Sequence, residues 1–301
     1  MKFLFLSAAM VFMAATTLVN TTAAQNRQFP ITDGNDEWYV DSAERTGDIR
    51  FADFAGRRSM WLRNNTQVIR SDVEFTDGTI EFDVAPMEKG NFVAVIFRRE
   101  SGTNHENIYL RIHRSGLYNA LQYAPRINGS STWQLYPEFN SKIDLPRMQW
   151  TRVRVEVTGT RVEVFINGGE KPALSVARLR GVPKKGSVGF WGRVNDKPAE
   201  WAAGLSNISI RPRAPSAVDG AKAPAAGPGV LDEWEVADAG PAQPRPVLDA
   251  AVSRDWKRAP VEEGGLVNLN RVFTATRGSR TVYARTSINS IEPRRARLEI
   301  G

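Results

Sequence analysis

A period-two alternation of apolar and polar residues runs through residues 60–210 and dominates the sequence. "TIEFDVA" places Ile80, Phe82 and Val84 on one side of an extended segment and two carboxylates on the other. "WTRVRVEV" and "TRVEVFING" alternate in the same way around the glycine turn of "VTGTR". Because successive side chains of a strand point to opposite faces, this pattern predicts half-buried β-strands. "NFVAVIFRRE" is apolar on both faces, so we expect it in the middle of a sheet.

The fold class expected from this pattern is all-β. No long stretch keeps a 3.6-residue period, and many short strands are separated by glycine and asparagine turns. Such a series is typical of a jelly-roll β-sandwich. The chain has no cysteine, which excludes disulfides, a thiol nucleophile and thiolate metal ligands, so the fold must depend on a sizeable hydrophobic core.

Composition divides the chain into four parts. Residues 1–24 have Lys2, an apolar run and small residues at 22–24, which predicts a signal peptide and a periplasmic or secreted location. The jelly-roll domain is expected over residues 25–212, followed by a Pro/Ala/Gly-rich linker over 213–229. No segment after the signal is long and apolar enough to predict a membrane span.

Residues 230–301 contain three strand-like runs, "GLVNLNRVF", "TVYARTSI" and "RARLEI". Three strands cannot close a sandwich, so we expect an incomplete second β domain. Its last strand would then need a partner edge, within the chain or in another molecule.

Charge and motifs exclude several functions. The net charge is +7, but basic residues are scattered among acidic ones, and no basic stripe predicts a nucleic-acid partner. The sequence has no phosphate-binding glycine loop and no Gly-x-Ser-x-Gly elbow. Two histidines exclude a histidine-rich metal site, although a mixed site of His113 and carboxylates stays open. We therefore predict no cofactor and no metal.

Several segments resemble the concanavalin A-like lectin/glucanase superfamily, most closely its laminin-G-like branch, the 3-keto-disaccharide hydrolase domain. The resemblance covers roughly residues 38–212 and is carried by "VIFRRE", "IYLRIHRSG", "NALQYAP", "STWQLYPE", "QWTRVRVEVTGTRVEVFINGGEKPAL" and "GSVGFWG" followed by "NISI". It implies two curved antiparallel sheets with ligands on the concave one. The family's N-terminal Leu-Phe-Asn/Asp-Gly run is missing here, so the resemblance supports the fold more than the activity.

Candidate site residues follow from strand alternation and this resemblance. If Leu110 and Ile112 point inward, then Tyr109, Arg111 and His113 share the opposite face. The substrate-binding candidates are Tyr109, Gln122, Gln134, Tyr136 and Trp191, and the catalytic candidates are His113, Arg111 and Arg98. Arginine and glutamine donate forked hydrogen bonds to sugar hydroxyls, and aromatic rings stack on a pyranose. The alternative is that these side chains simply decorate a solvated sheet face.

A carboxylate-pair glucanase is not expected. Glucanases of this superfamily place Glu-x-Asp-x-x-Glu on one strand to supply a nucleophile and an acid. Glu81 and Asp83 fit the first two places, but the third carboxylate is absent, so we expect both to face solvent.

Three functions remain. The leading hypothesis is an exported carbohydrate-binding protein of glycoside or polysaccharide handling. The first alternative is a hydrolase or lyase for 3-keto-glycosides, with His113 as base and Arg98 or Arg111 stabilising an enolate. The second alternative is a structural or protein-interaction module, which would show an exposed apolar patch instead of a polar groove.

Overall fold

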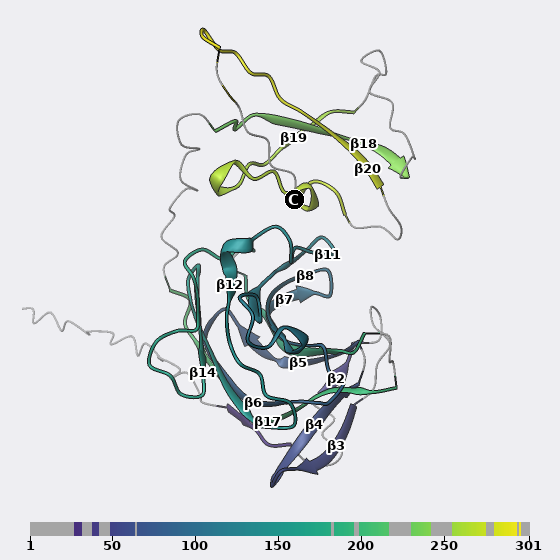
Figure 1. The fold of residues 1–301 in the computed structure, drawn as a ribbon, viewed down its shortest axis with the longest axis vertical. Helices are drawn as coiled ribbons and strands as arrows, with labels where there is room; N and C mark the ends of the chain where they lie inside the picture. The colour runs from purple at the N-terminus through teal and green to yellow at the C-terminus, as the bar shows by residue number, and fades with distance from the viewer. Residues whose placement is uncertain are drawn as a thin grey trace, which may run out of the picture.

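The computed structural model describes residues 27–31, 38–41, 49–63, 65–181, 184–195, 199–216, 230–241, 255–274, 280–293 and 295. Two antiparallel sheets face each other across one hydrophobic core, and a third, smaller sheet lies beyond one end of this sandwich (Figure 1). The protein is therefore all-β, with a jelly-roll sandwich as its main body. The predicted signal peptide and most of the predicted linker lie outside the described residues.

The first sheet has the strand order β15-β14-β13-β6-β17-β4-β3, with β1 paired to β17. Its strands are β15 (Leu174–Val176), β14 (Arg161–Ile166), β13 (Thr151–Thr158), β6 (Asp77–Pro86), β17 (Trp201–Arg213), β4 (Arg57–Arg63), β3 (Ile49–Phe54) and β1 (Arg27–Phe29).

The second sheet has the order β11-β10-β8-β7-β16-β5-β2, and β9 pairs with both β8 and β12. Its strands are β11 (Ser130–Ser131), β10 (Arg126–Ile127), β8 (Asn104–Arg111), β7 (Phe92–Ser101), β16 (Gly186–Arg193), β5 (Thr66–Phe75), β2 (Tyr39–Val40), β9 (Leu121–Tyr123) and β12 (Asn140–Ser141). Two short 3-10 helices, η1 (Ile112–Arg114) and η2 (Pro137–Phe139), follow β8 and β11.

The period-two pattern places side chains as predicted in both sheets. Ile80, Phe82 and Val84 of β6 are buried in the core between the sheets. Strand β7 lies between β8 and β16 and is covered on both faces. The turn between β13 and β14 is only Gly159–Thr160, and Gly159 has φ +54°, a backbone conformation that glycine adopts readily.

The C-terminal part forms a sheet of β19 (Lys257–Ala259), β18 (Trp234–Pro241) and β20 (Arg280–Arg285). The strand predicted for "TVYARTSI" is present in β20, whereas "RARLEI" lies almost wholly outside the described residues. The strand predicted for "GLVNLNRVF" is wrong. That region forms η3 (Glu263–Gly265) and η4 (Leu269–Arg271), because two glycines take positive φ and the Asn268 side chain accepts a hydrogen bond from the Asn270 N–H.

Within the described residues, no helix has the length and apolarity needed to cross a bilayer.

Candidate functional site

A groove of about 230 Å³ lies on the outer face of the second sheet. We call it the groove throughout. Its lining comes from β7, β8, β9, β10, β11, β16 and the turn after β11: Phe92, Tyr109, Arg111, Gln122, Arg126, Ser131, Trp133, Trp191 and Arg193.

Strand register explains why these side chains meet. Phe92 pairs with both Arg111 and Arg193, which gives one row across three strands. The next row contains Trp191, Tyr109 and Gln122, joined through Ala94 of β7. Side chains of directly paired residues lie on the same face about 5 Å apart, so the two rows form one continuous surface.

The aromatic side chains of the groove differ in exposure. Trp191 packs against the rings of Phe92 and Tyr109, with centroids 6.0 and 5.6 Å away, and is only 7% exposed. Trp133 stands in the turn after β11 and is 46% exposed. The Arg111 guanidinium lies 5.6 Å from the centroid of the Trp133 ring. Trp133 is therefore the aromatic platform that a ligand can reach, and the other rings form the floor.

The polar groups of the groove are incompletely satisfied. Gln122 is buried, and its Nε2 donates to the Trp133 carbonyl at 2.6 Å, while its Oε1 has no partner among the described residues. The Tyr109 hydroxyl lies 3.2 Å from the Ser131 Oγ. A buried acceptor without a donor is uncommon in folded proteins, whereas the exposed Tyr109 hydroxyl is open to a ligand.

His113 lies at the edge of this surface, in η1 and not in the strand. Its ring is exposed and packs edge-on against Phe92 at 4.7 Å, but it does not line the groove. Desolvation lowers the pKa of His113 and neighbouring arginines add to this, although the Asn91 carbonyl 3.0 Å from Nδ1 acts in the opposite direction. The imidazole is therefore biased toward its neutral form, with the proton on Nδ1 and Nε2 free to accept.

Arg98 lies away from the groove. Val95 and Phe97 point into the core as expected, but the register of β7 shifts after Phe97 and Arg98 has φ +48°, which is the signature of a β-bulge. The bulge turns Arg98 inward, where Nη2 donates to Asp77 Oδ1 at 2.8 Å and to the Gly159 carbonyl at 2.5 Å. Both side chains of this ion pair are 1% exposed.

The alternation expected for residues 133–136 is also wrong. These residues form a turn that leads into η2, where Pro137 stands in the first helical turn, so no strand period applies. As a result Trp133 reaches the groove, Tyr136 is buried, and Gln134 is exposed outside the groove lining.

Five lining residues were missed by sequence reasoning: Phe92, Arg126, Ser131, Trp133 and Arg193. The sequence contained a signal for two of them, Arg126 and Ser131. Asn128 and Gly129 both have positive φ and form a two-residue hairpin turn between β10 and β11, as Asn-Gly pairs commonly do. This turn pairs Arg126 directly with Ser131, so both side chains fall on one face.

Glu81 and Asp83 lie on β6 of the other sheet. Asp83 accepts hydrogen bonds from Arg57 and Asn207, each at 2.6 Å, and Glu81 forms an ion pair with Arg211 at 2.8 Å. Asp83 is buried, so the expectation that it faces solvent is wrong. Its cationic partners hold it as a structural carboxylate.

A second cavity of about 230 Å³ lies where the C-terminal segment meets the sandwich, and we call it the junction pocket. It is lined by Arg98, Glu100, Asn104, His105, Glu106, Arg126, Ile127, Asn128, Gly181, Lys184 and Arg271. Arg126 has no ion-pair partner among the described residues, whereas Arg98 pairs with Asp77 at 2.8 Å, Lys184 with Glu100 at 3.1 Å and Arg271 with Glu262 at 2.8 Å. Burial raises the pKa of Glu106, which accepts a hydrogen bond from the Tyr123 hydroxyl at 2.6 Å.

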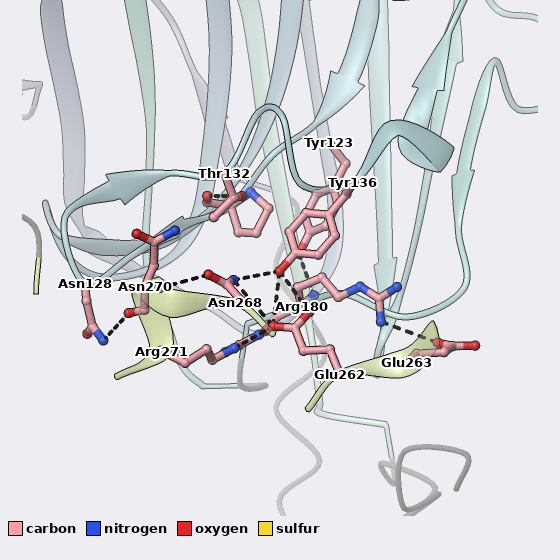
Figure 2. A network of polar contacts seen from close by, with 11 residues as sticks. Tyr123, Asn128, Thr132, Tyr136, Arg180, Glu262, Glu263, Asn268, Asn270 and Arg271 are labelled. Atoms are coloured by element: carbon pink, nitrogen blue, oxygen red, sulfur yellow. Dashed lines mark hydrogen bonds and ion pairs between the residues drawn. The ribbon is translucent and has the colours of Figure 1, made fainter. Parts of the chain in front are cut away.

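The C-terminal segment is held at this junction by a connected polar network (Figure 2). The Tyr136 hydroxyl donates to Glu262 at 2.9 Å and accepts from Asn268 Nδ2 at 3.0 Å. Asn128 donates to the Asn270 carbonyl at 2.8 Å, and Arg271 donates to the Arg180 carbonyl. The sandwich and residues 262–271 therefore form one bonded unit, and Tyr136 serves this contact.

Among the described residues, no group of three or more His, Cys, Asp or Glu side chains is arranged to hold a metal ion.

No family model matches the sequence, and no curated protein matches it. The resemblance to the 3-keto-disaccharide hydrolase branch therefore stays a prediction. Solved structures with similar folds include a carbohydrate-binding module from Bacillus subtilis, at 13% identity and a TM-score of 0.41, covering 58% of this chain and 92% of that chain. A Bacillus licheniformis β-glucanase matches at 11% identity and a TM-score of 0.42, over 63% of this chain and 98% of that chain.

A protein with a galectin-like fold from Bacillus subtilis matches at 14% identity and a TM-score of 0.43, over 62% of this chain and 98% of that chain.

Proposed function

We propose that this protein is a carbohydrate-binding domain and that the groove holds a saccharide. The observation that carries the proposal is that one groove brings the exposed Trp133 ring together with the Arg111 guanidinium and the Tyr109 hydroxyl. A pyranose presents an apolar face that stacks on an indole and hydroxyls that exchange hydrogen bonds with a phenol. The surrounding guanidinium groups supply donors for the ring and hydroxyl oxygens.

The lining of the groove supports binding more than hydrolysis. It contains no aspartate, glutamate or histidine among the described residues. Glycosidases of either stereochemistry use two carboxyl groups that flank the scissile bond. Glu81 and Asp83, the carboxylates that match the glucanase pattern best, belong to the other sheet and are held by arginine and asparagine.

The location predicted by residues 1–24 fits this function. A binding domain in the periplasm or outside the cell meets glycosides and polysaccharides directly. Membership of the laminin-G-like branch is part of the same proposal, because that resemblance implies a ligand on one sheet face.

The test is a binding screen with neutral and acidic oligosaccharides, read out by tryptophan fluorescence and by thermal shift. We expect Trp133→Ala to weaken binding by about tenfold, because it removes the stacking platform. Tyr39→Ala is the matched control, since Tyr39 is 41% exposed on β2 at the opposite edge of the same sheet and lies outside the groove lining. Absence of binding to every sugar, or equal loss in both variants, would refute the proposal.

A second candidate is the 3-keto-glycoside hydrolase or lyase, which the state of His113 favours. A neutral imidazole with Nδ1 beside the Asn91 carbonyl has Nε2 available as a base, and Arg111 is near enough to influence its pKa. Because Arg98 is buried against Asp77, only Arg111 remains to stabilise an enolate. Turnover of a 3-keto-glucoside that is lost in His113→Ala would establish this activity, and no turnover would exclude it.

A further inference from the structure

Three arginines in the groove are not compensated by any acidic side chain. Arg111, Arg126 and Arg193 all line it, and among the described residues none of their side chains has a hydrogen bond or ion pair to another protein group. Most other arginines of the sandwich have a carboxylate partner, for example Arg27 with Asp72 at 2.6 Å and Arg57 with Asp83 at 2.6 Å. The groove therefore gathers three guanidinium groups that have no carboxylate partner among the described residues, unlike most arginines of the sandwich.

We infer that the saccharide bound in this groove is acidic, carrying a carboxylate or a sulfate that the unpaired arginines recognise. This inference rests on the proposed carbohydrate-binding function and adds the class of ligand to it. Guanidinium groups bind carboxylate and sulfate oxygens through two parallel charge-assisted hydrogen bonds, which are stronger than their hydrogen bonds to the hydroxyls of a neutral sugar.

Arg111 and Arg126 are partly removed from water, which makes a missing partner costly, whereas Arg193 is exposed. The Nε of Arg126 is buried and has no partner in the described part of the chain. Desolvation, together with repulsion from Arg114, lowers the pKa of Arg111. A charge that is held at such a position without a counter-ion is destabilising, and a bound anion relieves this cost.

The remaining groups fit a sugar better than another anionic ligand. Single-stranded nucleic acid also binds aromatic and basic grooves, but it stacks successive bases on several open rings. Here only the Trp133 ring is substantially exposed, while Trp191 is 7% exposed and packs against Phe92 and Tyr109. One platform beside the exposed Tyr109 hydroxyl suits a single pyranose whose carboxylate or sulfate faces the arginines.

The decisive experiment is a calorimetric titration of the protein with four probes. These are oligogalacturonate, a sulfated dextran oligosaccharide, a neutral malto-oligosaccharide and oligothymidylate. We expect at least one of the two acidic saccharides to bind about tenfold more tightly than the neutral one, with the difference shrinking as salt is raised. The first two probes distinguish a carboxylate from a sulfate as the recognised group.

Two groove variants and one control locate the effect. Arg111→Gln and Arg126→Gln should each weaken binding of the acidic saccharide about tenfold and weaken binding of the neutral one much less, because glutamine keeps an amide donor but removes the charge. Arg161→Gln removes the same charge from β14 of the other sheet, where Arg161 is 57% exposed, and should change neither. This control matters because the whole chain is basic, with a net charge of +7.

The outcomes separate the two claims. Binding of neutral sugar as tight as that of the acidic ones, lost in Trp133→Ala, would overturn the inference and leave the proposed function intact. No saccharide binding at all would overturn both. Equal weakening by Arg161→Gln, or binding of oligothymidylate tighter than that of the acidic saccharides, would show a non-specific or nucleic-acid surface and would also overturn the inference.

Discussion

The groove and the junction pocket have similar volumes and are both rich in arginine, yet the arginines that line only one of them are in opposite states. At the junction, Glu262 raises the pKa of Arg271 although burial alone would lower it. In the groove, desolvation lowers the pKa of Arg111, which has no carboxylate partner in the described structure. The presence of a carboxylate partner, and not the number of arginines, therefore distinguishes a cation that stabilises the fold from one that is available to a ligand.

The shared wall of the two cavities sharpens this contrast. Arg126 lines both, and it stays unpaired, while Asn128 two residues later is held by the Asn270 carbonyl. The C-terminal segment thus fixes the hairpin that carries Arg126 without neutralising it. The polar contacts of the junction pocket, next to the groove, hold that hairpin in place.

The largest expected effect comes from breaking the buried pair at the junction. In Asp77→Asn, Arg98 loses its counter-ion, and the amide cannot accept all the hydrogen bonds that Asp77 receives from Arg98, Gly159 and Ser216. We expect a loss of about 3–5 kcal/mol in the free energy of unfolding, measured by urea denaturation.

Asp53→Asn is the control for this measurement. It breaks the Arg58–Asp53 contact of 3.2 Å, in which Asp53 is 77% exposed, and such surface pairs contribute about 0–1 kcal/mol. Equal destabilisation by the two variants would contradict the view that burial makes the junction pair structural.

The next effect concerns the tyrosine hydroxyls of the two regions. Tyr136→Phe removes the hydrogen bonds to Glu262 and Asn268, so we expect a loss of about 1–2 kcal/mol and faster amide exchange over residues 262–271. Tyr109→Phe removes only the contact with Ser131, which is made at an exposed position in the groove, and should leave both measurements unchanged. If the two variants behave alike, the network does not hold the segment.

Titration of Glu106 gives a smaller, pH-dependent effect. Because burial raises its pKa, the folded protein binds this proton more tightly than the unfolded chain does. Its contribution is therefore present below the ordinary pKa of glutamate and is lost as the pH rises toward the raised value, with a slope of up to about 1.4 kcal/mol per pH unit. Glu106→Gln should flatten this part of the stability profile, and an unchanged slope would mean that Glu106 is ionised at no cost.

The sequence predicts the parts of this comparison that depend on local strand period. Tyr109, Gln122 and Trp191 lie in regular strands, so alternation places them on the groove face with Arg111. The predicted positions of Arg98 and Tyr136 are wrong because a β-bulge displaces Arg98 and a 3-10 helix follows Tyr136, and strand alternation predicts neither feature. The role of Tyr109, Gln122 and Trp191 in binding stays a prediction.

No local sequence pattern predicts the contacts at the junction. Tyr136 and Glu262 are 126 residues apart, and nothing in either local sequence indicates that they meet. Which arginines are paired is likewise a property of the folded chain, because the carboxylate of a buried pair can come from any strand. Which arginines of the groove lack a carboxylate partner could therefore be determined only from the structure.

Replacing the same residue type in both regions is the most direct test of the comparison. Arg271→Gln removes the cationic partner of Glu262 and a donor to the Arg180 carbonyl, so it should lower the free energy of unfolding by about 1.5–3 kcal/mol. Arg111→Gln removes a desolvated cation that has no carboxylate to lose, so its effect should stay within about 0.5 kcal/mol. Urea denaturation of the two variants without ligand decides the matter: a loss in Arg111→Gln as large as that in Arg271→Gln would mean that the groove arginines also stabilise the fold, and the distinction between the two regions would fail.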